Sequence, residues 1–177
     1  MHARLLPSVV LVLVVFSGIG RGDGPDLGAV RRLLEQEAPS ARAAALRRLA
    51  GNEDPRALKL LLGALDDDHP YVRSAAAGVL GALDGRPQAR LARDLRRLRS
   101  ERARVAGAGA AALWVSETGR SLLETLAGDP RPAVRVAALR WLAEDPDDRA
   151  RDRLREGLRD PDGLVRAWSL DALVRLG

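Results

Sequence analysis

Arginine returns every 31 residues over most of this 177-residue chain, at Arg42, Arg73, Arg104, Arg135 and Arg166. The residue four positions later is aliphatic in each case: Leu46, Ala77, Ala108, Leu139 and Leu170. A unit of this length cannot bury its apolar face alone, so similar units must stack on one another. The spacing therefore predicts a linear array of repeats, not one globular core.

Apolar residues around each arginine follow the period of an α-helix. They favour offsets of −1, +2, +3, +6, +7 and +10 from the arginine, which form one stripe of a helix. Residues 67–70, 129–132 and 160–163 supply cap residues before three of these helices. A second set of amphipathic segments is predicted near residues 26–37, 55–65, 87–98, 120–127 and 148–158. No segment alternates like a strand, so we predict an all-α domain of five helix pairs.

The arginine-bearing helices resemble the second half of a HEAT repeat. The likeness is clearest in residues 129–142 (DPRPAVRVAALRWL) and 160–173 (DPDGLVRAWSLDAL). The short period is similar to that of the HEAT-like repeats of phycobilisome lyase subunits. The resemblance covers residues 26–177 and implies a right-handed α-solenoid with the arginine-bearing helices on its concave side. Gln36 and Leu98 depart from the pattern, because other repeats have aspartate at that position.

The resemblance also implies a hydrogen-bonded ladder between neighbouring repeats, which involves the aspartate six residues before the arginine. The residues at these positions are Asp67, Arg73, Asp129, Arg135, Asp160 and Arg166. A charge that recurs beside an apolar stripe needs a partner when it is buried. We therefore expect these arginines to be buried and bonded within the stack, with a structural role and not a phosphate-binding one.

The first twenty residues have the pattern of a secretory signal. Arg4 precedes an apolar run over residues 9–16, and small residues follow at 17–20. The apolar run is shorter than the about 20 residues that a membrane-spanning helix needs. We predict a signal peptide in residues 1–20, a linker in 21–25, a repeat domain in 26–177, and export to the periplasm or outside the cell. An uncleaved N-terminal membrane anchor is the alternative.

The composition argues against catalysis. The chain has no cysteine and only two histidines, His2 and His69, which excludes cysteine nucleophiles and most acid–base chemistry. The acidic run that ends at His69 is interpreted as a helix cap and not a metal site, because no second ligand cluster is visible. We expect no enzyme activity, metal or cofactor. The alternative is an accessory subunit of a lyase-type or nucleic-acid enzyme.

Positions +1, +5 and +8 face outward on the concave side if the apolar stripe and position +4 are buried. These positions hold mostly small residues, and only Arg47, Arg140 and Asp171 are charged. The candidate partner-binding residues are Arg47, Ser74, Gly78, Val105, Gly109, Val136, Arg140 and Asp171. We predict that the protein is a monomer and binds a peptide or helix of another protein here. Arg47 and Arg140 are expected to bind acidic groups at the edge of that segment. The alternative is that an alanine- and glycine-rich chain places small residues everywhere.

Two further features invite a functional interpretation. Arg86, Arg90, Arg93 and Arg97 form a basic stripe on one predicted helix, suited to an anionic surface or simply solvated. The export signal and the lack of an exposed aromatic residue argue against nucleic acid. The three tryptophans, Trp114, Trp141 and Trp168, fall on the apolar stripe and are expected to fill the core, although an aromatic ligand cradle is the alternative.

Overall fold

A computed structural model describes residues 25–177, which form ten α-helices and no strand. The predicted signal in residues 1–20 and most of the predicted linker lie outside the described residues. The helices are α1 (Leu27–Leu34), α2 (Pro39–Arg47), α3 (Pro55–Ala64), α4 (Pro70–Gly81), α5 (Arg86–Arg96), α6 (Glu101–Ala112), α7 (Glu117–Leu126), α8 (Pro132–Glu144), α9 (Asp148–Gly157) and α10 (Gly163–Leu176). The predicted all-α solenoid of five helix pairs is confirmed.

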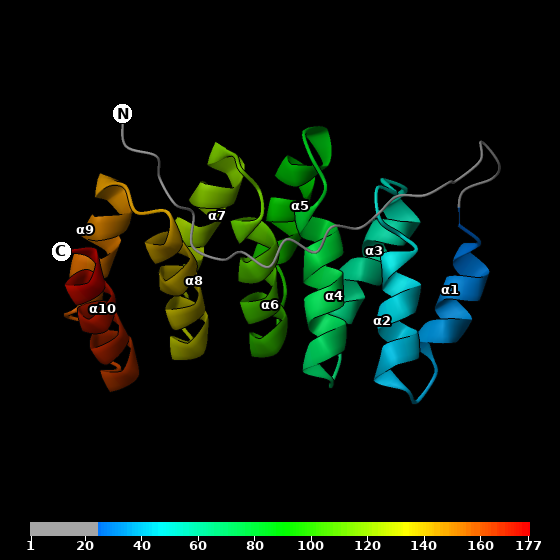
Figure 1. Cartoon of the computed structure of the whole chain (residues 1–177), viewed down its shortest axis with the longest axis horizontal. Helices are drawn as coiled ribbons and strands as arrows, with labels where there is room; N and C mark the ends of the chain where they lie inside the picture. The colour runs from blue at the N-terminus through cyan, green and yellow to red at the C-terminus, as the bar shows by residue number, and fades with distance from the viewer. Residues whose placement is uncertain (1–24) are drawn as a thin grey trace.

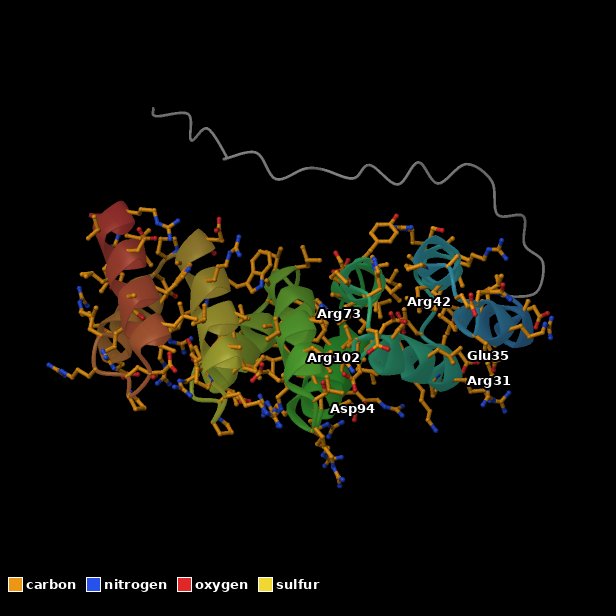
Figure 2. All side chains as sticks on the ribbon, turned by 90° about the horizontal axis from the view of Figure 1, so that it is seen from below. Arg31, Glu35, Arg42, Arg73, Asp94 and Arg102 are labelled. Carbon is orange, nitrogen blue, oxygen red and sulfur yellow. The ribbon has the colours of Figure 1, made fainter. Side chains whose placement is uncertain are left out.

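The helices form two layers, with the odd-numbered helices in one and the even-numbered helices in the other (Figures 1 and 2). Each even-numbered helix packs against the next one in the series, from α2 to α10. The odd-numbered layer is looser, because α3 and α5, and likewise α7 and α9, make few contacts or none. We call the outer surface of α2, α4, α6, α8 and α10 the even-helix face. It corresponds to the predicted concave side.

Local sequence explains where the helices begin. Asp54 accepts a hydrogen bond from the Arg56 amide (2.7 Å) and Pro55 starts α3 with its φ already fixed. His69 caps α4 through Nδ1, which accepts from the Tyr71 amide at 3.2 Å. Helix α7 begins at Glu117, earlier than the predicted residue 120, because Ser116 caps it. The caps therefore fix the register of each helix pair.

The core lies between the two layers. Leucines from the odd-numbered helices meet the −1, +3, +4 and +7 positions of the even-numbered helices, and most of these side chains are fully buried. Backbones approach closely where a glycine permits it. A Cβ atom on Gly119 would lie 2.6 Å from the Ala111 carbonyl oxygen, so α7 can pack against α6 only with glycine at this position.

The predicted apolar stripe is too wide. Trp114 is buried and its indole N–H donates to the Leu80 carbonyl (3.0 Å), as a core residue should. Trp141, at position +6, is instead 38% exposed, and Trp168 is half-buried under the Arg175 guanidinium. Ala44, at position +2, is also exposed. Position +2 lies at the edge of the stripe, where the neighbouring helices cover it only in part. Position +6 is covered where the side chain is small, as at Ala110 and Ala172, but it does not hold the whole indole of Trp141.

An arginine–aspartate ladder joins neighbouring repeats. Arg42 Nε and Nη2 donate to the two carboxylate oxygens of Asp67 at 2.9 and 2.8 Å. Arg135 makes the same forked contact with Asp160 at 2.8 and 2.6 Å. Arg104 pairs with Asp129. In each case the aspartate lies 25 residues after the arginine, in the loop that leads to the next even-numbered helix. The remaining nitrogens bond loop carbonyls, so each guanidinium is held on both sides.

The ladder differs from the one implied by the family resemblance in which residues take part. Arg73 and Arg166 bond only the carbonyls of their own loops, at 2.8 to 2.9 Å. Arg135 is buried as expected, whereas Arg73 is half-buried and Arg166 is exposed. The reason is that the carboxylate comes from the following repeat. Leu98 occupies that position for Arg73, and no carboxylate of the described repeats lies within ion-pair distance of Arg166.

We expect Arg135→Ala to lower the free energy of unfolding by about 2 kcal/mol, because it leaves the Asp160 carboxylate without its forked partner in a nearly dry site. Urea unfolding followed by circular dichroism measures this change. Arg175→Ala is the control, since the Arg175–Asp171 pair is exposed and should contribute about 0.5 kcal/mol or less. Equal effects of the two substitutions would contradict a structural role for the ladder.

The ladder should also make stability depend on pH in acid. The hydrogen bonds from Arg135 lower the pKa of Asp160 below its ordinary value, so the carboxylate binds its proton less readily in the folded state. This contribution is therefore complete above pH about 4 and is lost as the pH falls below that value. The difference in Tm between wild type and Asp160→Asn should shrink as the pH is lowered from 7 to about 2. A constant difference would contradict this origin.

Candidate protein-binding groove

A groove of about 580 Å³ crosses the even-helix face over α4, α6 and α8. We call it the even-face groove. Its lining residues are Pro70, Arg73, Ser74, Ala77, Glu101, Arg102, Val105, Ala106, Gly109, Ala133, Val136, Ala137, Arg140 and Trp141. Three successive repeats contribute to it, so the packing of the even-numbered helices sets its shape.

Small and apolar side chains make up much of the groove surface. Val105 and Val136 are half-buried and stand at the same position of successive repeats, on α6 and α8. Gly109 lies beside the Trp141 indole: a Cβ atom on Gly109 would lie 3.9 Å from Trp141 Nε1. The partly exposed Trp141 offers a large flat contact area with a polar N–H at its edge. The groove can thus receive an apolar segment at close range.

Basic residues predominate among the charged residues of the groove, where Arg73, Arg102 and Arg140 face only Glu101. Arg102 is already paired, because Nε and Nη1 donate to Asp66 and Asp68 at 2.8 and 2.7 Å. No ion pair of Arg73 or Arg140 occurs within residues 25–177. Two cations of the groove therefore remain available to an acidic ligand.

The contact between Arg102 and Asp66 shifts the pKa values of both residues. The pKa of Asp66 is lowered by hydrogen bonds from the Ser100 and Arg102 side chains, and Asp66 in turn raises the pKa of Arg102. Figure 2 shows Arg102 next to Arg73 at the junction of α4 and α6. Both partners of the pair are about half exposed, so solvent screens their attraction. We call the contacts of Arg102 with Asp66 and Asp68 the Arg102 clasp.

The groove brings together five of the eight residues predicted to bind a partner: Ser74, Val105, Gly109, Val136 and Arg140. The other three do not line it. Arg47 donates to the Tyr71 hydroxyl at 2.8 Å and lies over that ring, while Asp171 pairs with Arg175 at 2.9 Å. Gly78 is half-buried elsewhere on α4.

Two outward positions were assigned wrongly. Ala43 and Gly81 were expected to face solvent, but both are buried against neighbouring helices. Sequence reasoning also missed Arg73, Arg102 and Trp141 as groove residues. A signal for Trp141 was present, since Val79, Ala110 and Ala172 are small and buried at the same position of other repeats. An indole does not fit the space that these side chains occupy.

The predicted basic stripe lies on α5, in the odd-numbered layer. Arg90, Arg93 and Arg97 are exposed, and the Arg86 side chain lies outside the described part of the structure. Arg93 lines a hollow of about 340 Å³ between α5 and α7, and Arg90 lines one of about 470 Å³ between α3 and α5. Asp94 marks this side of the stack, away from the even-numbered helices (Figure 2). The stripe and the even-face groove are thus separate surfaces.

Another hollow, of about 710 Å³, lies between α1 and α3. It is larger than the even-face groove, but it contains none of the eight residues predicted to bind a partner. Its two carboxylates, Asp66 and Asp67, are already paired with Arg102 and Arg42. The remaining charged residues, Arg31, Arg56 and Lys59, line it on α1 and α3. We therefore place the candidate site in the even-face groove.

Two general features bear on what the described chain can do. Between residues 25 and 177, no helix combines the length and the apolar character needed to cross a bilayer. In the same range no three histidine, cysteine or acidic side chains gather in a way that could hold a metal ion.

Comparison with known proteins identifies the repeats. A family model described as HEAT repeats matches residues 28–114 and 119–177. The chain is 27% identical to a chain in the complex of CpcE and CpcF of phycocyanin lyase from Nostoc sp. PCC7120, with a TM-score of 0.35, and the match covers 83% of this chain and 79% of that one. It is 19% identical to the designed armadillo repeat protein YIII(Dq)4CqI, with a TM-score of 0.41 and coverage of 85% and 82%. No curated protein shows significant similarity.

Proposed function

Because this chain belongs to the HEAT repeat family, we propose that it is a non-catalytic scaffold that binds a segment of another protein in the even-face groove. One observation carries the proposal. The groove combines an apolar surface, the exposed indole of Trp141 and the unpaired cation Arg140 on helices of successive repeats. Solvent-facing helical surfaces normally carry more charge than this one does.

The shape of the groove favours an extended or helical protein segment over a small molecule. It runs across three even-numbered helices and is open along its length. Small residues such as Ser74, Gly109 and Ala133 let the backbone of a partner approach closely. Helical segments commonly bind in such grooves through apolar side chains on one face, with charged groups at the edge. The charge of the groove favours a segment that carries acidic residues.

We expect Val105→Glu and Val136→Glu, each made separately, to abolish capture of the partner while the protein stays folded and helical, with Tm lowered by a few degrees because both side chains are half-buried. Each substitution places a carboxylate on the apolar surface of the groove, where a bound segment would bury it. Pull-down from envelope and secreted fractions, with the captured protein identified and then titrated in purified form, measures the effect. Val115→Glu is the matched control, because Val115 is fully exposed in the loop between α6 and α7.

If both groove variants still capture the partner, the even-face groove is not the binding site. The exposed arginines of the basic stripe would then be the surface to test, through the salt dependence of binding to an anionic surface. Val115→Glu should capture as well as wild type. Loss of capture in all three variants would indicate a general effect of added negative charge and not a groove contact.

We also propose that the protein is exported. The basic start, apolar run and small residues of positions 1–20 support this proposal. Expression of the full chain followed by fractionation and N-terminal sequencing tests it. The mature protein should leave the cytoplasm and begin near Arg21, and a protein that still begins at Met1 in the membrane fraction would instead support the anchor. Recovery of the intact chain in the cytoplasm would contradict both.

A further inference from the structure

Arg73 is the only ladder arginine in the even-face groove, and it lacks the carboxylate that Arg42 and Arg135 have. In those two residues, Nη1 bonds loop carbonyls while Nε and Nη2 bond one aspartate. Arg73 keeps the first half of this arrangement, because Nη1 donates to the Asp67 and Asp68 carbonyls at 2.8 and 2.9 Å. Its Nε and Nη2 form no hydrogen bond to any residue in the described range. The guanidinium of Arg73 is therefore held in place by loop carbonyls, while its Nε and Nη2 donors remain free to bind a carboxylate.

The missing carboxylate corresponds to Leu98. This side chain is partly buried against the core, with Cδ1 3.8 Å from where a Cβ on Gly107 would lie. It therefore packs between α5 and α6 and supplies no acceptor to Arg73. The Arg102 clasp connects the two repeats instead. The junction of α4 and α6 is thus held without the Arg73 fork.

A second donor is unused at the same place. Each ladder aspartate also accepts a hydrogen bond from the backbone amide two residues later: His69 at 2.8 Å, Arg131 at 2.9 Å and Asp162 at 2.9 Å. The corresponding amide in this repeat belongs to Ser100. It donates to no acceptor among residues 25–177. By equivalence of the repeats, the Arg73 fork and the Ser100 amide outline an empty carboxylate site.

We propose that Arg73 binds a carboxylate of the partner segment, which supplies the aspartate that the ladder lacks at this junction. The inference rests on the proposed function, since the even-face groove delivers the ligand. A carboxylate fits because its two oxygens match the guanidinium fork, as Asp67 and Asp160 show elsewhere in the stack. The two loop carbonyls already hold the guanidinium, so little side-chain freedom is lost on binding. The carboxylate comes from an acidic side chain or from a chain terminus.

Peptide binding tests the inference on the whole chain. The probe is a fluorescein-labelled, C-terminally amidated peptide with leucine and alanine on one helical face and glutamate on the other. A second peptide has glutamine in place of each glutamate, and a third has glutamine but a free C-terminal carboxylate. Fluorescence anisotropy should show about tenfold weaker binding of the glutamine peptide, the size expected for one charge-assisted forked contact. Recovery with the third peptide would identify a chain terminus as the source.

Leu98→Asp is the decisive variant. It places a carboxylate at the ladder position, so Arg73 becomes paired within the chain and affinity for the glutamate peptide should fall about tenfold. Leu98→Asn removes the same apolar contact without adding charge, and should bind like wild type. Because the new ion pair forms only in the first variant, the Tm of Leu98→Asp should exceed that of Leu98→Asn.

Arg73→Gln should lose affinity for the glutamate peptide to a similar extent. Its control is Arg166→Gln, since Arg166 has the same contacts to its own loop but lies on α10, outside the groove. Unchanged affinity in Arg73→Gln, or equal affinity in the two Leu98 variants, would overturn the inference. Equal binding of the glutamate and glutamine peptides by wild type, abolished by Val136→Glu, would overturn it while leaving the proposed function intact. Absence of any binding by wild type contradicts both.

Discussion

Ion pairs between an arginine and the aspartate 25 residues later join the even-numbered helices at three of their four junctions. Much of the packing between even-numbered helices involves alanine and glycine, whose small side chains interlock weakly and tolerate sliding. A forked contact between a guanidinium and a carboxylate tolerates much less displacement. Its net contribution to stability is modest, but it specifies register, which is the best-attested role of shielded ion pairs. Within the even-face groove, the Arg104–Asp129 pair joins α6 to α8, whereas the Arg102 clasp joins α4 to α6.

The groove straddles the one junction where the pattern changes. Between α2 and α4, α6 and α8, and α8 and α10, an arginine reaches forward to the next repeat. Between α4 and α6 the direction is reversed, because Arg102 reaches back to Asp66 and Asp68. Arg73 is therefore not needed to join these two repeats, and it lies on the side where the groove opens. An arginine at this position of the repeat therefore joins the next repeat where the following loop supplies an aspartate. It is left for a ligand where that loop supplies Leu98.

The sequence predicted the helices well and their mutual contacts less well. Periodicity places a residue on a face of its own helix, so the helix pairs, the core leucines and Val105, Val136 and Arg140 on the even-helix face followed directly. Contacts between repeats depend on the rise and rotation from one repeat to the next, which no periodicity contains. This is why the pairing of Asp67 with Arg42 and the hydrogen bond from Arg47 to Tyr71 were not foreseen. The exposure of Trp141 was not predicted, because periodicity places a residue on the apolar face but does not say how large a side chain the neighbouring helices can cover there.

The exposure of the Arg102 clasp makes ionic strength act unevenly along the stack. Counterions screen the attraction of Arg102 for Asp66 and Asp68, whose side chains are 49%, 47% and 91% exposed. The Arg42–Asp67 and Arg135–Asp160 pairs are only 11 to 15% exposed and are largely protected from screening. Dissolved salt therefore weakens the contacts of Arg102, at the edge of the even-face groove, more than it weakens these two ladder pairs.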